Sequence, residues 1–163
     1  ADRGGRQGAA RAVRGMADEE AAEGGKVEVE YEERVKHVSR IAKPLASKKC
    51  TKRLHKLVKK GASVKAIRRG VKEVVKALRK GERGLCVIAG DISPLDVITH
   101  LPILCETKEV PYMYVPSKHD LGAAASTKRP TSCVLVAPKG DFPEQELLDK
   151  CTKEAVENAF IAF

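Results

Sequence analysis

A five-residue apolar run, Leu85–Ala89, limits the possible folds of this chain more than any other feature. It follows Gly84 and precedes Gly90 and Asp91, so turn-forming residues bound it on both sides. An apolar run without polar alternation is typical of a strand that is buried on both faces. A strand of this kind needs a sheet with helices packed against both of its sides, which is an α/β architecture.

Apolar residues at helical spacing form two stripes before this run. The stripes consist of Cys50, Leu54, Leu57 and Val58, and of Val71, Val74, Val75 and Leu78. Residues three, four and seven positions apart lie on one face of a helix, so each stripe predicts an amphipathic helix. We expect the first helix to end at Gly61 and the second at Gly81, because glycine commonly follows a last helical turn.

Shorter segments continue an alternation of strands and helices along the chain. Residues 64–68, 112–115 and 133–137 have the composition of strands, and the first of them is expected at an edge of the sheet. Ser93, followed by Pro94 and Asp96, predicts the N-cap of a helix that Pro102 breaks or kinks. This alternation predicts a sheet enclosed between helical layers.

Two further helices are predicted in the last third of the chain. Ser117, with an acid three residues later, predicts the N-cap of a short helix over residues 117–124. A final helix is expected to start near Pro143. Its predicted inward residues are Leu147, Leu148, Cys151, Ala155 and Val156.

The first 40 residues differ in composition from the rest. Residues 1–40 are rich in Gly, Ala, Arg and Glu with little apolar periodicity, so we expect a disordered tail there. Met16, followed by Ala17 and two acids, resembles a natural translation start within this tail. Residues 41–163 are of the size of one domain and are predicted to form a single core.

The basic residues are concentrated in one segment. Residues 41–83 contain 16 Lys and Arg against two acids, whereas residues 1–40 and 84–163 each have a small excess of acids. This polarised distribution indicates a polyanion partner, whose counterions the protein displaces on binding. A solvated lysine surface that only aids solubility is the other interpretation, and the run is long for it. With no Trp, three Phe and three Tyr, we do not expect aromatic base-stacking platforms.

The five cysteines do not form a metal or disulfide pattern. Their number is odd, and none forms a C-x-x-C pair or a Cys/His cluster, so we expect buried thiols and a reducing compartment. No run approaches the ~18 apolar residues of a membrane span. We expect a soluble, intracellular protein without a membrane partner.

No enzymatic motif is apparent. Ser117, Lys118, His119 and Asp120 are consecutive, and consecutive residues on a helix point in different directions, so they cannot form a nucleophile with its base. Neither a phosphate-binding G-x-x-x-x-G-K-[ST] loop nor a dinucleotide motif is present, and no His is at metal-ligand spacing from another ligand. We expect a protein that is not an enzyme and needs neither a cofactor nor a metal.

The stretch from Arg68 to Lys76 is the most informative about function. The apolar stripe of its helix leaves Lys72, Glu73 and Lys76 exposed. Gly70 lets a partner approach the helix start, where free N–H groups and the helix dipole favour a phosphate. Glu73 has two interpretations: an acid that stabilises the first helical turn, or an acceptor for the amino and imino groups of a base while cations hold the backbone.

Several of these motifs, in the same order, resemble the kink-turn-binding ribosomal protein superfamily. The similar blocks are residues 41–47, 69–74, 88–91, 100–106, 111–112, 116–118, 120–124 and 128–131. The opening block and Gly-Val-Lys-Glu-Val at residues 70–74 look like the H/ACA ribonucleoprotein branch of this superfamily. The resemblance covers about residues 41–140.

The resemblance implies a fold and an RNA site. The implied fold is a three-layer α/β/α sandwich with a mixed four-stranded sheet. The implied RNA-binding residues are Arg69, Gly70, Lys72, Glu73 and Lys76 at the helix start, Ser93 and Val97, and Thr127, Lys128 and Arg129 in a nearby loop. Kink-turn-selective relatives have Asn where this chain has Lys72. An ammonium cannot replace both the donor and the acceptor of an amide, so we expect broader affinity for structured RNA.

The resemblance also implies a setting. It implies a core subunit that binds H/ACA guide RNA beside a pseudouridine synthase subunit and small H/ACA core proteins. The particle would modify ribosomal and spliceosomal RNA in the nucleolus and Cajal bodies. Two alternatives remain: a ribosomal or C/D-box paralogue that binds kink-turns, and a detached substrate-recognition domain of an RNA-modifying enzyme.

Overall fold

The computed structural model describes residues 31–138, 142 and 144–161. It has two units, residues 1–36 and 37–163. In the first unit, residues 31–36 are helical. Most of the predicted disordered tail, including Met16, lies outside the described residues. In the second unit the chain engages the core from Val38 onward, and the Ser39 N–H donates to the Gly90 carbonyl oxygen at 2.9 Å.

The described strands form one mixed sheet in the second unit, as expected. Its four strands are β1 (Ile67–Arg69), β2 (Leu85–Ala89), β3 (Tyr112–Val115) and β4 (Cys133–Val136). They lie in the order β1-β4-β2-β3. β4 is antiparallel to both of its neighbours, while β2 and β3 are parallel. The predicted edge strand is therefore confirmed as β1, although it begins three residues later than expected.

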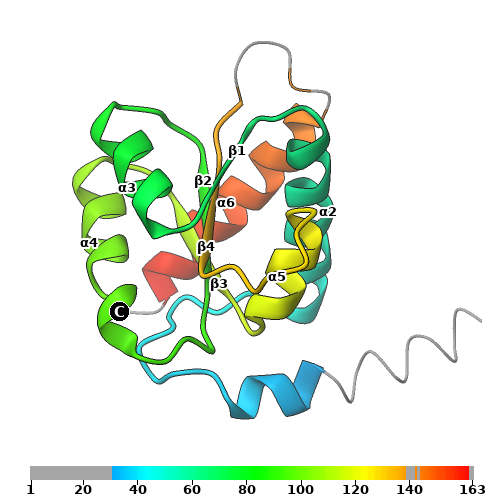
Figure 1. The fold of residues 1–163 in the computed structure, drawn as a ribbon, viewed down its shortest axis with the longest axis vertical. Helices are drawn as coiled ribbons and strands as arrows, with labels where there is room; N and C mark the ends of the chain where they lie inside the picture. The colour runs from blue at the N-terminus through cyan, green and yellow to red at the C-terminus, as the bar shows by residue number, and fades with distance from the viewer. Residues whose placement is uncertain (1–30, 139–141, 143, 162–163) are drawn as a thin grey trace, which may run out of the picture. The chain divides into compact units, whose positions relative to one another are not determined.

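Helices cover both faces of this sheet, which confirms the three-layer α/β/α fold (Figure 1). One layer contains α2 (Lys48–Ser63), α5 (Lys118–Ala124) and α6 (Gln145–Ile161), and the other contains α3 (Val71–Arg79) and α4 (His100–Thr107). All five residues of β2 are buried, as predicted. Val87 faces the first layer and Ile88 the second, because successive side chains of a strand point to opposite faces.

The first predicted helix is longer than expected. Its stripe Cys50, Leu54, Leu57 and Val58 is buried, but α2 continues past Gly61 to Ser63. A Cβ on Gly61 would lie 2.7 Å from Cγ2 of Ile67. The glycine therefore serves close packing of the helix on β1 and does not end the helix.

The prediction that a helix starts at Ser93 is wrong. Only a short 3-10 turn, Leu95–Val97, follows Ser93, whose side chain is exposed, and α4 begins at His100. Pro102 is the third residue of α4, where a backbone N–H would have no intrahelical acceptor. Proline is therefore accommodated at the start of the helix and does not break it.

The last two helices largely agree with the predictions. The Ser117 hydroxyl accepts a hydrogen bond from the Asp120 N–H, which confirms the predicted cap of α5. In α6, Leu148, Cys151 and Ala155 are buried as predicted. Val156 is not, since 43% of it is exposed. No helix in the described part of the chain has the length and apolar character that crossing a bilayer requires.

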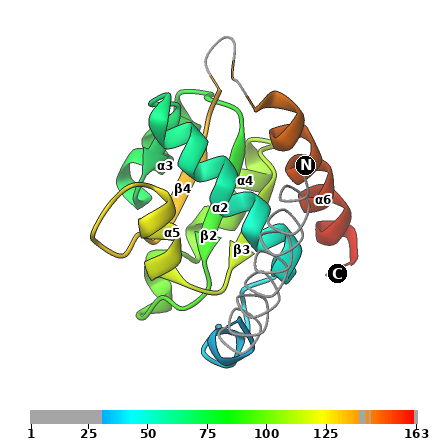
Figure 2. The same ribbon diagram turned by 90° about the vertical axis from the view of Figure 1, so that its right-hand side faces the viewer.

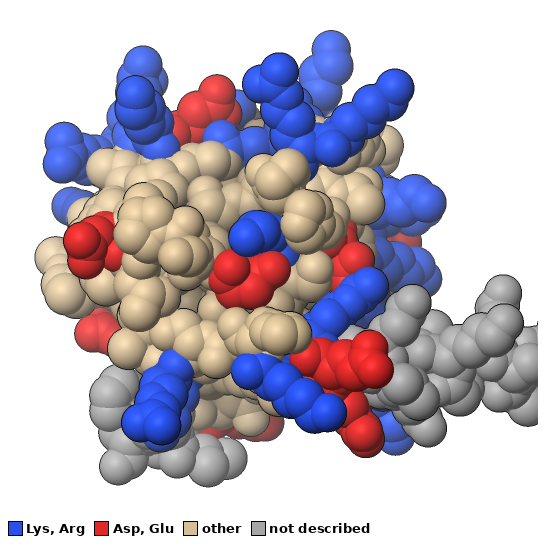
Figure 3. All heavy atoms as spheres, turned by 60° about the horizontal axis from the view of Figure 1, so that its bottom comes forward, with Lys and Arg blue, Asp and Glu red and all other residues tan. Residues whose placement is uncertain are grey.

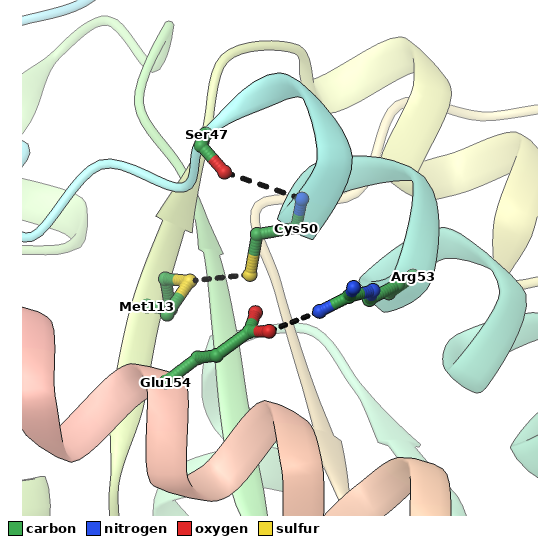
Figure 4. A network of polar contacts seen from close by, with 5 residues as sticks. All are labelled: Ser47, Cys50, Arg53, Met113 and Glu154. Atoms are coloured by element: carbon green, nitrogen blue, oxygen red, sulfur yellow. Dashed lines mark hydrogen bonds and ion pairs between the residues drawn. The ribbon is translucent and has the colours of Figure 1, made fainter.

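A group of contacts joins α2 to β3 and α6 (Figure 4). The Ser47 hydroxyl caps α2 by accepting from the Cys50 N–H at 3.3 Å. The Cys50 thiol lies 3.3 Å from the sulfur of Met113 on β3, and Arg53 forms an ion pair with Glu154 of α6. One turn of α2 is thus held to β3 by the contact between the two sulfur atoms and to α6 by the ion pair.

All five cysteines are buried free thiols, as predicted. Burial raises the pKa of the Cys50 and Cys133 thiols to about 12 and that of Cys151 to about 11. These three thiols are therefore protonated at neutral pH, and a protonated thiol is neither a nucleophile nor a metal ligand.

Candidate nucleic-acid interface

The junction between β1 and α3 presents an open helix start. Arg69 is the last residue of β1, and Gly70 is the N-cap of α3 with φ of +84°. The Gly70 N–H donates to the Cys133 carbonyl oxygen on β4 at 2.9 Å, which fixes this position against the sheet. A Cβ on Gly70 would meet nothing within 4 Å. Glycine is required here by backbone conformation, and the space in front of the helix start is open.

The first turn of α3 exposes the three predicted polar side chains. Lys72, Glu73 and Lys76 are exposed, while Val74 and Leu78 are buried. The first-turn N–H groups have no acceptor within the helix, and Gly70 has no side chain to cap them. They therefore carry the positive end of the helix dipole. The Glu73 carboxylate accepts from the Arg69 N–H at 3.4 Å. Glu73 thus has a local role, through one long hydrogen bond, and keeps acceptor capacity for a partner.

A shallow hollow of about 280 Å³ lies beside these residues. It is lined by Arg68, Glu73, Lys76, Ala77, Lys80 and Glu82. Arg68 donates from Nε and Nη2 to both carboxylate oxygens of Glu82 at 3.2 Å. This hydrogen-bonded carboxylate raises the pKa of Arg68. Sequence reasoning missed this pair, because nothing in the pattern links positions 68 and 82 before β1 and the turn after α3 are brought together.

The loop after α5 is attached to the same junction. The Arg69 guanidinium donates from Nη1 to the Ala125 carbonyl oxygen at 3.0 Å. The Thr127 hydroxyl donates to the Arg129 carbonyl oxygen at 2.8 Å and lies 3.3 Å from that of Gly122. Lys128 and Arg129 are exposed. Arg69 therefore acts as a strut that positions this loop, and Thr127 shapes it from within.

The segment after β2 is joined to the start of α5 through Asp91. Its carboxylate accepts from the Lys118 N–H at 2.9 Å, and Lys118 Nζ donates to the Asp91 carbonyl oxygen at 3.3 Å. Ser93 and Val97 are exposed on this segment, Val97 to 41%. Among the described residues, no hydrogen bond joins Ser93 or Val97 directly to α3 or to the loop.

The structure therefore brings together most of the predicted residues. Arg69, Gly70, Lys72, Glu73 and Lys76 share one helix start, and the loop carrying Thr127, Lys128 and Arg129 is bonded to it through Arg69. Figure 3 turns the view of Figure 1 so that its bottom comes forward. Lys and Arg side chains gather along the upper rim and right side of this face, and its largely uncharged middle also holds Asp and Glu side chains. A face of this kind offers cations for phosphates at its margin and neutral surface for bases.

Neither a cluster of metal ligands nor a free Ser117 hydroxyl is found in the described ranges. They contain no group of three His, Cys, Asp or Glu side chains that could hold a metal ion. Ser117 is buried and its hydroxyl serves the α5 cap. The arrangement is suited to recognition of an anion with attached hydrogen-bond donors.

Comparison with known proteins gives the family. Residues 52–146, more than half of the chain, match the model of the ribosomal protein L7Ae/L30e/S12e/Gadd45 family. The chain belongs to this family. Every residue of the candidate interface lies within the matched range of this L7Ae-type domain.

Individual relatives narrow the comparison within the L7Ae-type family. The chain is 64% identical over 110 residues to an Arabidopsis thaliana protein named H/ACA ribonucleoprotein complex subunit 2-like, covering 66% of this chain and 70% of that one. It is 49% identical over 124 residues to Bos taurus H/ACA ribonucleoprotein complex subunit 2, covering 76% and 80%. These names confirm the resemblance to the H/ACA branch.

A solved structure of the L7Ae-type family supports the fold. The protein named Giardia lamblia 15.5kD RNA binding protein superposes with a TM-score of 0.70 at 32% identity. The match covers 74% of this chain and 98% of that one. The mixed sheet and its two helical layers are therefore shared with a protein that is named for binding RNA.

The strut between α3 and the loop can be tested by removing the Arg69 guanidinium. We expect Arg69→Ala to lower the free energy of unfolding by about 1 kcal/mol, the net value of one hydrogen bond. Amides of residues 126–129 should then exchange hydrogen faster, measured by mass spectrometry. Arg79→Ala, an exposed cation at the other end of α3, is the control and should leave this exchange unchanged. Equal exchange in both variants would show that the loop does not depend on Arg69.

Proposed function

We propose that this protein is a non-catalytic RNA-binding core subunit of an H/ACA ribonucleoprotein, supporting RNA-guided pseudouridylation of ribosomal and spliceosomal RNA and hence ribosome biogenesis. The observation that carries the proposal is an exposed carboxylate, Glu73, among the cations of an open helix start. A site that binds phosphate alone would gain nothing from a negative charge there. A site that also reads a base would gain a hydrogen-bond acceptor for that base.

The geometry divides the work of binding between two kinds of contact. The first-turn N–H groups, Lys72 and Lys76 hold phosphates and orient a bent RNA. The free acceptor capacity of Glu73 takes the amino and imino hydrogens of an unpaired or sheared guanine. Lys128 and Arg129 close on the RNA from the loop that Arg69 positions. Ser93 and Val97 supply a polar and an apolar contact from the segment after β2.

The proposed role needs no catalytic group or cofactor in this chain. The thiols whose pKa values are given above are protonated, and the Ser117 hydroxyl is committed to a helix cap. Uridine isomerisation would be performed by a pseudouridine synthase subunit of the same particle. Partners of this protein would be H/ACA guide RNA, that synthase and the small H/ACA core proteins, in the nucleus, chiefly the nucleolus and Cajal bodies. The H/ACA names of the relatives support this setting.

Substitution of Glu73 tests the base-reading contact. We expect Glu73→Ala to weaken binding to a folded RNA with sheared G·A pairs about tenfold or more, since a base contact is lost. Arg129→Ala should weaken it as well. Lys76→Ala should mainly reduce the salt dependence, by about one unit of slope per lost phosphate contact. Filter binding across a salt series measures both quantities.

A matched control separates this effect from a general charge effect. Glu146 is an exposed acid in the first turn of α6, as Glu73 is in the first turn of α3. Glu146→Ala should leave RNA affinity unchanged or slightly raise it. If Glu73→Ala bound as tightly as Glu146→Ala, Glu73 would be a helix-stabilising acid only.

The residue at position 72 distinguishes this proposal from its nearest alternative, a kink-turn-selective ribosomal or C/D-box paralogue. An amide offers a donor and an acceptor together, whereas the Lys72 ammonium only donates. We expect Lys72→Asn to raise the ratio of affinities for a kink-turn over a straight duplex, measured by competition binding at fixed salt. An unchanged ratio would show that residue 72 does not determine selectivity for kink-turns.

Membership of the particle is tested in cells. Affinity-tagged full-length protein is expected to copurify with H/ACA guide RNAs and a pseudouridine synthase, detected by RNA sequencing and mass spectrometry. A Glu73→Ala, Arg129→Ala double variant should recover less guide RNA. Recovery of C/D-box RNAs or ribosomal subunits in place of H/ACA RNAs would support the paralogue. Recovery of neither class of RNA would contradict membership of an H/ACA particle. RNA binding itself would still be decided by the filter-binding assay.

A further inference from the structure

The outward face of α2 carries a continuous row of cations, separate from the interface at α3. We call this row the α2 ridge, and it consists of Lys49, Lys52, Arg53, Lys56, Lys59 and Lys60, all exposed. At 3.6 residues per turn these positions fall within an arc of about 120°. From Lys49 to Lys60 the ridge is about 16 Å long. The opposite side of the helix holds its buried residues.

The ridge is unfavourable for the helix that carries it. The first turn of α2 contains no acid, although the helix dipole favours one there. Lys48 and Lys52 are four residues apart, as are Lys52 and Lys56, and like charges at this spacing repel. The pKa of Lys48 is lowered, mainly by desolvation and to a smaller extent by the charge of Lys52. Alternating Glu and Lys would be as soluble and would stabilise the helix, so solubility does not explain the row.

Acids in α6 and directly before it compensate only one side of the ridge. Arg53 pairs with Glu154, and Lys60 Nζ lies 3.9 Å from a carboxylate oxygen of Glu144. Among the described residues, no ion pair involves the other four cations of the ridge, Lys49, Lys52, Lys56 and Lys59. Lys49 lines a hollow with Glu154 and Glu157 of α6, so the uncompensated charge of the ridge is that of Lys52, Lys56 and Lys59.

The unpaired side of the ridge lies toward α5. α2 packs against both α5 and α6, and Figure 2 shows it between them. Arg53 reaches Glu154 of α6 and Lys60 reaches Glu144, directly before α6. The other margin of the same arc, with Lys52 and Lys59, therefore lies on the α5 side. A polyanion on the ridge would thus avoid α6 and lie toward α5.

α5 is also the element that separates the ridge from the candidate interface. It is seven residues long, about 10 Å, and is followed by Ala125, whose carbonyl oxygen accepts from Arg69 at the start of α3. Its exposed residues are His119 and Ala123. The acid of α5, Asp120, is half-buried, so α5 presents little negative charge to an RNA that crosses from the interface to the ridge.

From these contacts we propose that the α2 ridge is a second RNA-binding surface, which holds the phosphate backbone of a duplex stem extending from the folded RNA element at α3. The inference rests on the proposed function. The ridge offers charge and no acceptor comparable to Glu73, so its contacts are independent of sequence. It adds affinity in proportion to stem length and confers no base selectivity.

The test compares two RNAs and two pairs of substitutions. One RNA contains only the folded element, and the other carries the same element with a stem extended by roughly ten base pairs, which is longer than the ridge. Binding of the full chain is measured by filter binding across a salt series. The variants are Lys52→Gln with Lys56→Gln on the ridge, and Glu73→Ala with Arg129→Ala at the interface. Lys108→Gln is the control, because Lys108 is exposed at the end of α4 in the opposite helical layer.

The expected result separates the two surfaces. The ridge variant should lose about two units of salt slope on the extended RNA, one for each phosphate contact, and none on the short RNA. The interface variant should lose affinity for both RNAs. Removing the like-charge pair should leave the midpoint of thermal unfolding equal or higher, which shows that weaker binding does not come from unfolding.

Other outcomes overturn the inference in distinct ways. Equal slopes for the ridge variant, the Lys108→Gln control and the unsubstituted protein on the extended RNA would overturn the ridge as an RNA surface. If the interface variant still lost affinity, the proposed function would stand, and an acidic protein would become the partner to test on α2. If neither RNA bound the unsubstituted protein, the proposed function would fail together with the ridge.

Discussion

The pairing of β1 with β4 is the interaction on which the candidate interface depends. Three residues of β1 pair with Val134, Leu135 and Val136, and the Gly70 N–H continues this ladder to the Cys133 carbonyl oxygen. That last hydrogen bond ends the strand and starts α3 at one place. The helix start, its exposed acid and its cations are therefore positioned by the sheet, so RNA would meet a preformed surface. Arg69 extends this order to the loop after α5 through a single bond.

Charge is distributed so that cations with and without partners have different roles. Arg68 is held by Glu82, and Arg53 by Glu154, so these guanidinium groups join secondary-structure elements. Lys72 and Lys76 extend from a helix that is already packed through its apolar side. Exposed ion pairs contribute little to stability, whereas uncompensated cations attract a polyanion over about a Debye length. Within one basic segment, the paired cations thus have a structural role and the unpaired cations a role in recognition.

The predicted fold succeeded where local pattern and packing agreed. The buried strand Leu85–Ala89, the stripe of α3 and the Ser117 cap all have strong periodic or capping signals, and all are present. Gly61 was predicted to end a helix and is instead buried within one, because Ile67 of β1 packs against it. Ser93 has the sequence of a helix start, yet α4 begins seven residues later. At Gly61 a tertiary contact overrides the local signal, and sequence periodicity does not report such a contact.

By itself the sequence determined which residues of the α3 segment are exposed, since the apolar stripe of an amphipathic helix must face the core and leaves Lys72, Glu73 and Lys76 outside. It also determined the concentration of positive charge. Only the tertiary structure decided what stands beside that helix start: the loop tied down by Arg69, the pair of Arg68 with Glu82, and a cationic α2 across α5. These neighbours are distant in the chain, and strand pairing and helix packing on the sheet bring them together.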